Sequence, residues 1–190
     1  MIYSDYKDAA ERHIEVCLQL VNVIEQIQKK EQIAVLSPRE QLDKRKILAN
    51  LYYLSGYIIE CSYNCAIYTC IGWTSTVTSL KANSTTYNVS CWQDSSAAFV
   101  IRRSGSGIKQ HQLSGNMNFF QTVVPIVAAN QIPLIGYDIF GRVCYDLFDN
   151  WNAEVRYLIA PSVNLDYDPV FDFYFLSVEV YEGLIKNSLI

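Results

Sequence analysis

One long stretch of the chain is almost free of charge. It runs from Ile47 to Leu80, and its single charged side chain is Glu60. Within it, apolar or small residues recur every three or four positions, which is the spacing of one helical face. These positions are Ile47, Leu51, Leu54, Ile58, Cys61, Cys65 and Tyr68. The opposite face carries no further charge, so we predict a central helix, buried on most sides between Tyr52 and Tyr68, around which the other helices pack.

A membrane-spanning helix over residues 47–72 is the alternative interpretation of this stretch. Polar side chains in its middle disfavour that alternative, because they are costly in lipid. These side chains are Asn50, Ser55, Glu60, Ser62 and Asn64. We therefore expect a bundle helix, and no membrane among the partners.

The start of the central helix is marked by Ser37-Pro38-Arg39-Glu40. Serine at the N-cap, proline at the first helical position and glutamate at the third form a capping box. The first turns, Arg39 to Lys46, are charged and are expected to emerge from the bundle. Farther along, Gly56 disfavours the helix by about 1 kcal/mol relative to alanine. A glycine in that position suggests that another helix crosses closely.

A first amphipathic helix is predicted from Tyr3 to Gln28 by the same periodicity. Its apolar stripe consists of Tyr3, Tyr6, Ala10, His13, Cys17, Leu20, Ile24 and Ile27. His13 lies on this stripe, and we interpret it as a core histidine in preference to a catalytic one.

Three further helical segments follow in the second half of the chain. A run over 117–130 is kinked or ended by Pro125, and a helix over 139–148 has Asp138 as its cap. The last helix is predicted to begin at Asp168-Pro169, with the aspartate as N-cap and the proline at the first helical position. The predicted stripe of that helix is Phe171, Tyr174, Val178, Tyr181 and Ile185.

Residues 74–116 differ from the rest, because they are rich in Ser, Thr, Asn and Gly. We expect a long, irregular and mobile insertion, with weak strand-like alternation over 85–92 and a second strand or a short helix over 97–103. The whole pattern predicts an all-α fold: an up-and-down antiparallel bundle of about five helices in one domain, residues 1–190.

Charge and cysteine content narrow the functional classes. A net charge of −4 gives no general basic surface for duplex nucleic acid. The N-terminus lacks the apolar segment of a signal peptide, so we expect a cytoplasmic protein whose six cysteines are free thiols. A metal half-site at Cys61 and Cys65 would need two further ligands, and only two histidines exist. We expect neither a metal nor another cofactor.

Two groups of polar residues are candidates for a site. Glu60 is a carboxylate in an apolar helix and needs a partner, for which Arg156, in a stretch sparse in charge, is the natural candidate. A structural salt bridge is favoured over a functional role for this pair. The second group is Arg103 and His111, beside a Gly-Ser-rich loop that contacts phosphate in one interpretation and is simply solvated in the favoured one.

The segment from Tyr53 to Cys61, Tyr-Leu-Ser-Gly-Tyr-Ile-Ile-Glu-Cys, resembles the second-helix motif of HEPN domains, a family of nucleotide-binding helical domains. Two further pieces are similar in order: His111-Gln112-Leu113, and Trp151 followed by Arg156-Tyr157. The resemblance touches both ends of the chain and leaves 74–108 uncovered. It implies a helical bundle that forms a homodimer and acts on RNA or a nucleotide. It also implies a toxin–antitoxin or defence-type system with a nucleotidyltransferase-type partner.

The sequence departs from the family in two places. Tyr63-Asn64 replaces the Leu-Lys that usually follows the motif, so a basic residue is missing. Ribonuclease members carry an arginine and a histidine separated by about four to six residues, which joins a proton-transfer group to a stabilising cation. Here, seven residues separate Arg103 from His111. We therefore favour a catalytically silent binding module over a metal-independent ribonuclease. In either case Glu60, Arg156, Trp151 and Tyr157 are the expected buried polar or functional residues.

Overall fold

The computed structural model describes residues 4–70, 87–91, 94–101, 113–123, 144–154, 165–186 and 190. Four long helices make up most of the described chain: α1 (Ser4–Glu31), α2 (Pro38–Cys70), α4 (Leu113–Val123) and α7 (Tyr167–Lys186). A short helical segment spans residues 144–149. Two strands, β1 (Tyr87–Cys91) and β2 (Asp94–Ile101), lie between α2 and α4 in the sequence. The fold is an all-α bundle, as predicted, with this strand pair as its one β element among the described residues.

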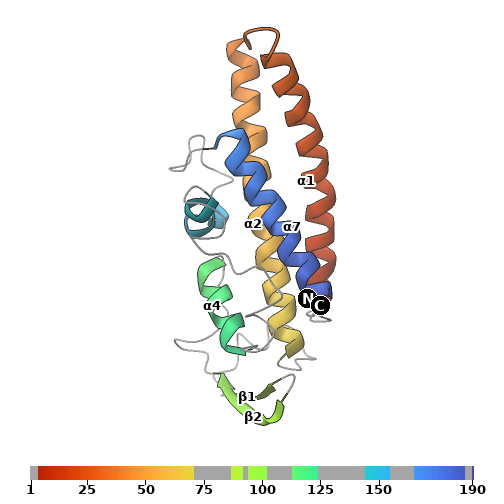
Figure 1. The fold of residues 1–190 in the computed structure, drawn as a ribbon, viewed down its shortest axis with the longest axis vertical. Helices are drawn as coiled ribbons and strands as arrows, with labels where there is room; N and C mark the ends of the chain where they lie inside the picture. The colour runs from red at the N-terminus through yellow and green to blue at the C-terminus, as the bar shows by residue number, and fades with distance from the viewer. Residues whose placement is uncertain are drawn as a thin grey trace.

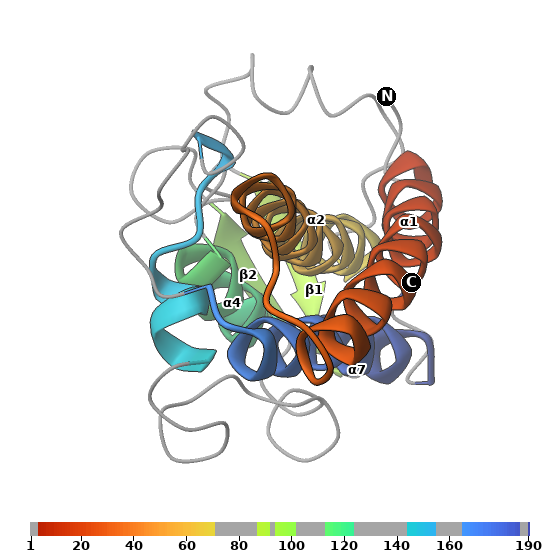
Figure 2. The same ribbon diagram turned by 90° about the horizontal axis from the view of Figure 1, so that it is seen from above.

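Helix α2 is the centre of the bundle (Figures 1 and 2). It forms a long antiparallel hairpin with α1 and also contacts α7 and α4. Helix α7 runs antiparallel to α1, because its start at Tyr167 contacts Glu31 and its later residue Tyr181 contacts Glu11. Helix α4 packs on the second half of α2, where the rings of Phe120 and Tyr63 lie 5.4 Å apart.

The burial of α2 confirms the prediction made from its missing charges. Ile58 and Cys65 are buried, and so is every residue from Ile58 to Ile67. Before that point, α2 keeps a partly exposed edge formed by Tyr53, Leu54 and Tyr57. The largest fully buried side chains come from all four helices and the short helical segment: Tyr52, Tyr63, Phe120, Phe148, Phe173, Ile24, Leu48, Leu51, Ile58, Ile59 and Ile67.

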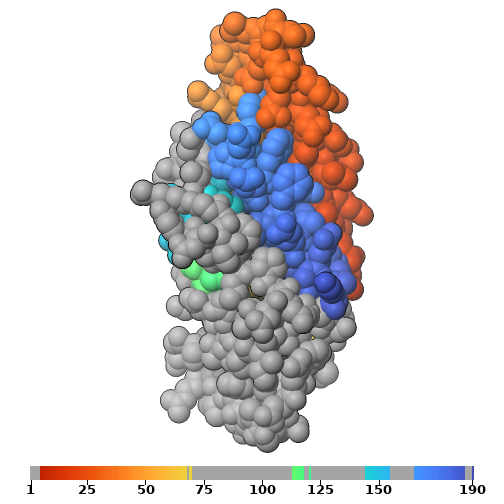
Figure 3. Space-filling model, in the orientation of Figure 1, coloured from red at the N-terminus to blue at the C-terminus, as the bar shows by residue number. Residues whose placement is uncertain are grey.

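The capping box at the start of α2 is confirmed. The Ser37 hydroxyl and backbone N–H both donate to Glu40 Oε2, over 2.7 and 2.9 Å, and the Glu40 N–H donates back to Ser37 Oγ over 3.4 Å. The first turns of α2 project, with the end of α1, beyond the other described helices (Figure 3). Their charged side chains are largely exposed, as expected.

The predicted limits of the later helices were partly wrong. Helix α7 begins at Tyr167, two residues before the expected position, and Pro169 lies within its first turn, where a missing N–H is tolerated. Helix α4 begins four residues before the expected start at Met117 and is described as far as Val123, ahead of Pro125.

The apolar face of α7 was also placed incorrectly. Of its predicted stripe, Tyr174 and Tyr181 are buried, whereas Phe171 and Val178 are half-buried and Ile185 is exposed. The remaining buried residues are Val170, Phe173, Leu176, Ser177, Val180 and Leu184. Apolar residues cover two adjacent faces of this helix, and packing against α2 and α1 selects the neighbouring one.

The insertion contains more regular structure than we predicted. Strands β1 and β2 pair antiparallel, with Tyr87 opposite Ile101 and Ser90 opposite Ala98, and an irregularity follows before Cys91. Of the strand-like alternation predicted over 85–92, residues 87–91 are confirmed as a strand, and residues 97–101 of the 97–103 segment belong to β2. The other residues of 74–112, and residues 139–143 of the predicted fourth helix, lie outside the described residues.

Among the described helices, none combines the length and apolar character that crossing a bilayer requires.

Candidate functional site

The side chain of Trp151 lies directly on the backbone of α2 at Gly56. A Cβ atom placed on Gly56 would overlap the indole ring. The indole Nε1–H donates a hydrogen bond to the backbone carbonyl of Tyr53, over 3.1 Å. The close neighbour of Gly56 is therefore an indole from the segment after residues 144–149, and the expected helix crossing was wrong. A glycine is needed here because an indole ring approaches a helix this closely only where no Cβ intervenes.

Aromatic rings extend this contact towards α1. Tyr57 meets Trp151 edge to face, at 5.1 Å between ring centroids and 86° between planes, and meets Tyr53 at 4.8 Å and 72°. On the other side, the imidazole of His13 lies 5.7 Å from the Tyr57 ring. Edge-to-face pairs of this kind are stabilising beyond the area they bury. The row His13, Tyr57, Trp151 joins α1, α2 and the 150–154 segment, and we call it the aromatic row.

His13 belongs to this row and is half-buried, in keeping with its interpretation as a packed histidine. Burial lowers the pKa of His13 below its usual value, and the positive charge of Arg12 lowers it further. The imidazole is therefore neutral at physiological pH. The sequence placed His13 on the core stripe and did not identify Tyr57 as its neighbour.

Glu60 lies one helical turn beyond Gly56 and is buried, as its surroundings in the sequence predicted. Its charge acts on neighbours from two helices. Burial raises the pKa of Tyr6 on α1 to about 12, with smaller contributions from Cys61 and Glu60. Glu60 thus lies near Tyr6 of α1.

The other predicted site residues fall outside the described residues. They are Arg103, His111, Arg156 and Tyr157. The pairing of Glu60 with Arg156 therefore stays a prediction. Trp151 is the one member of the predicted C-terminal motif that the structure describes, and it is buried against α2.

Four cysteines are buried free thiols: Cys17, Cys61, Cys65 and Cys144. Burial raises the pKa of Cys17 and Cys61 to about 12 and that of Cys144 to about 11, and it also raises the pKa of Cys65. A thiol with so high a pKa is protonated at neutral pH and is a poor nucleophile. No cluster of three or more metal-ligating side chains occurs within the described part of the chain.

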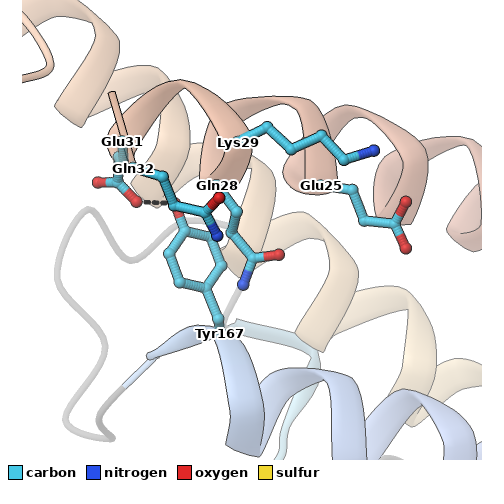
Figure 4. Close-up of a pocket in the computed structure, with 6 residues that line it drawn as sticks. All are labelled: Glu25, Gln28, Lys29, Glu31, Gln32 and Tyr167. Atoms are coloured by element: carbon cyan, nitrogen blue, oxygen red, sulfur yellow. Dashed lines mark hydrogen bonds between the residues drawn. The ribbon is translucent and has the colours of Figure 1, made fainter. Parts of the chain in front are cut away.

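A charged network joins the end of α1, the start of α2 and the start of α7. Lys44 Nζ donates to both carboxylate oxygens of Glu31, over 2.9 and 3.1 Å, and lies 4.0 Å from the centroid of the Tyr167 ring. The Tyr167 hydroxyl donates to the same carboxylate (Figure 4). Hydrogen bonds from these donors hold the pKa of Glu31 below its usual value, and Tyr167 contributes more than Lys44.

Beside this network is an open pocket of about 440 Å³. Four of its six lining side chains come from α1, one from the link that follows it and one from α7 (Figure 4): Glu25, Gln28, Lys29, Glu31, Gln32 and Tyr167. Ligand sites are usually enclosed and largely apolar, with a few convergent polar groups. This pocket is open and lined mainly by flexible side chains of mixed charge, so it does not define a catalytic centre.

Comparison with known proteins adds no identification: no model of a known protein family, no curated protein and no solved structure matches this chain.

Proposed function

We propose that the protein is a HEPN-like helical module that functions by binding. It forms a homodimer and engages a nucleotidyltransferase-type partner in a prokaryotic RNA- or nucleotide-related system of the toxin–antitoxin or defence type. Support for the family comes from the resemblance of its motifs and from the contact of Trp151 with Gly56 and Tyr53. That contact joins two motif segments that are almost one hundred residues apart in the sequence.

The observation that carries the binding role is an apolar flank of α1. Val16 and Val23 are 48% and 41% exposed, and the half-buried Leu20 and Ile27 lie on the same side of the helix. The spacing of these four residues, four–three–four, is that of a helix–helix seam. Helical phase places this flank on the side of α1 away from Glu11, which contacts Tyr181 of α7. A second copy of the chain covers it in our proposal.

The test of dimerisation is the mass in solution, measured by light scattering over a concentration series. The wild type is expected to be a dimer, and the double variant Val16→Glu/Val23→Glu a folded monomer. Leu18→Glu is the matched control, because Leu18 is 50% exposed on a different face of the same helix. A monomeric wild type, or equal dissociation by the Leu18 variant, would contradict the proposal.

The alternative function is a metal-independent ribonuclease that uses Arg103 and His111. It is disfavoured because the family's Arg–His spacing is absent. We expect purified protein to leave single-stranded and structured RNA intact in the presence of a chelator. Cleavage that disappears in both Arg103→Ala and His111→Ala would establish the alternative.

A further inference from the structure

The closed end of the α1–α2 hairpin carries two aliphatic side chains that are almost fully exposed. Ile33 and Val35, in the link between the helices, are 86% and 93% exposed. Leu42, one turn into α2, is also exposed, whereas Leu36 between them is buried. Solvent-exposed aliphatic residues are common singly. Two at the apex of a projecting hairpin are a different case, because both are presented together to whatever the apex meets.

The same segment is basic in an acidic chain. From Lys29 to Lys46 there are six basic and three acidic residues, a net charge of +3. The remaining residues of the chain contain nine basic and sixteen acidic residues, a net charge of −7. The net charge of the hairpin end is therefore opposite in sign to that of the rest of the chain, and its electrostatic field favours an anionic partner.

Ion pairs neutralise all three acidic residues of this segment. Glu31 accepts from Lys44, Glu40 accepts from Lys30, and Asp43 lies 3.9 Å from Lys46. The basic side chains left over are Lys29, Arg39 and Arg45, all exposed and without an ion pair to any described residue. The surface offered to a partner thus combines cations with two aliphatic side chains.

The position of the hairpin end leaves it accessible. The end of α1, the link and the first turns of α2 project past the start of α7 (Figures 1 and 3). The Glu31, Lys44 and Tyr167 network braces the hairpin just below this end. We define residues 29–46 as the hairpin tip.

We propose that the hairpin tip docks on the surface of an anionic lipid membrane, with Ile33 and Val35 entering the headgroup region and the surrounding cations contacting lipid phosphates and carboxylates. Basic residues near such a surface and apolar side chains at its boundary contribute together to peripheral binding. The proposal concerns surface contact only, whereas the sequence argument against a membrane concerned a spanning helix.

Nucleic acid is the other polyanion that a basic tip could meet. Single-stranded nucleic acid is bound through aromatic stacking platforms as well as cations. The tip contains no aromatic residue, and its apex side chains are aliphatic. Lipid therefore accounts for both features of the tip, whereas nucleic acid accounts only for its charge.

The proposal is tested by vesicle flotation of the full chain at low ionic strength. Vesicles contain phosphatidylcholine alone or phosphatidylcholine mixed with phosphatidylserine. We expect the wild type to bind only the mixed vesicles. The variant Arg39→Gln/Arg45→Gln should bind them more weakly, by about fivefold for each cation removed. Ile33→Ser/Val35→Ser should weaken binding about tenfold or more. This double variant should also weaken the fraction of vesicle binding that persists in high salt.

Matched controls remove the same groups elsewhere. Arg12→Gln/Lys186→Gln deletes two exposed cations far from the tip, and Leu18→Ser removes an exposed aliphatic side chain of α1. Both should bind mixed vesicles like the wild type, and all variants should keep the wild-type melting temperature because every altered side chain is exposed.

Three results would overturn the proposal. The first is no binding to mixed vesicles. The second is an equal loss in the control variants, which would indicate a non-specific charge effect. The third is a single-stranded RNA oligonucleotide that binds through the same tip residues and displaces the vesicles at equimolar phosphate, which would assign the tip to nucleic acid.

Discussion

The indole ring of Trp151 occupies the space that a side chain on Gly56 would fill. The ring is held there by a hydrogen bond from its Nε1–H to the Tyr53 carbonyl and by the edge of Tyr57. Position 56 therefore stays a glycine for a tertiary reason, at a local cost to the helix of about 1 kcal/mol relative to alanine.

Gly56→Ala should lower the free energy of unfolding by about 1–3 kcal/mol, because overpacking displaces the indole despite the better helix propensity. In a Trp151→Ala background, the same substitution should become neutral or stabilising, by up to about 1 kcal/mol. Urea unfolding of the four proteins in this double-mutant cycle measures the coupling. Asn50→Ala, at an exposed position of α2, is the control for propensity alone. Additive effects of the Gly56 and Trp151 changes would show that the two residues do not interact.

Two tyrosines of α2 should respond differently to loss of the hydroxyl. Tyr52 donates to the backbone carbonyl of Leu147 over 2.6 Å, whereas the buried Tyr63 hydroxyl has no hydrogen-bond partner among the residues that the structure describes. Tyr52→Phe should lower the free energy of unfolding by about 1–2 kcal/mol, because it leaves a buried carbonyl with one bond fewer. Tyr63→Phe should be neutral or stabilising, because it removes an unsatisfied polar group. Thermal unfolding compares the two, and a larger loss in Tyr63→Phe would reveal a partner for that hydroxyl.

Acid should loosen the start of α2 before it unfolds the bundle. Hydrogen bonds from Lys30, and then from Ser37, lower the pKa of Glu40 from its usual 4.5 to about 2. Because this pKa is lowered in the folded state, the stabilisation is complete above pH 4.5 and is lost as the pH falls towards 2. Glu40 is at the surface, so the effect is small and is screened by salt.

Amide NMR signals of residues 37–41, followed through this acid range, measure the loosening. Glu40→Gln should remove the response, since an amide does not titrate. Ser37→Ala should lower the free energy of unfolding by about 1 kcal/mol at neutral pH through loss of the N-cap. An unchanged acid response in Glu40→Gln would assign it to another carboxylate, of which Glu31 is the nearest candidate with a lowered pKa.

The pairing of Glu60 with Arg156 remains a prediction from the sequence. Loss of one partner of a buried ion pair costs about 3–5 kcal/mol, so Arg156→Met should be strongly destabilising. Glu60→Gln should be milder, because the amide still accepts a hydrogen bond. Thermal unfolding of the single and double variants gives the coupling between them. Additive losses would assign Glu60 another partner, and the nearby Tyr6 would be the first to test.

The sequence alone determined those parts of the bundle that depend on local interactions. The capping box of Ser37 and Glu40 closes within one turn, so four consecutive residues were enough to locate the start of α2. Similarly, the central position of α2 follows from the near absence of charge over 47–70, because a helix that water cannot solvate on any side must be covered.

Only the tertiary structure decided which surfaces meet. The neighbour of Gly56 is an indole from Trp151, and no local pattern separates that from a crossing helix. The buried face of α7 was likewise undetermined, because two of its adjacent faces are apolar and only packing against α2 and α1 selects one. The hairpin tip shows the same division: its charges can be read from the sequence, but the exposure of Ile33 and Val35, beside a buried Leu36, depends on where the remaining helices end. Periodicity specifies what each element can bury, whereas contacts between residues distant in the chain specify what it does bury.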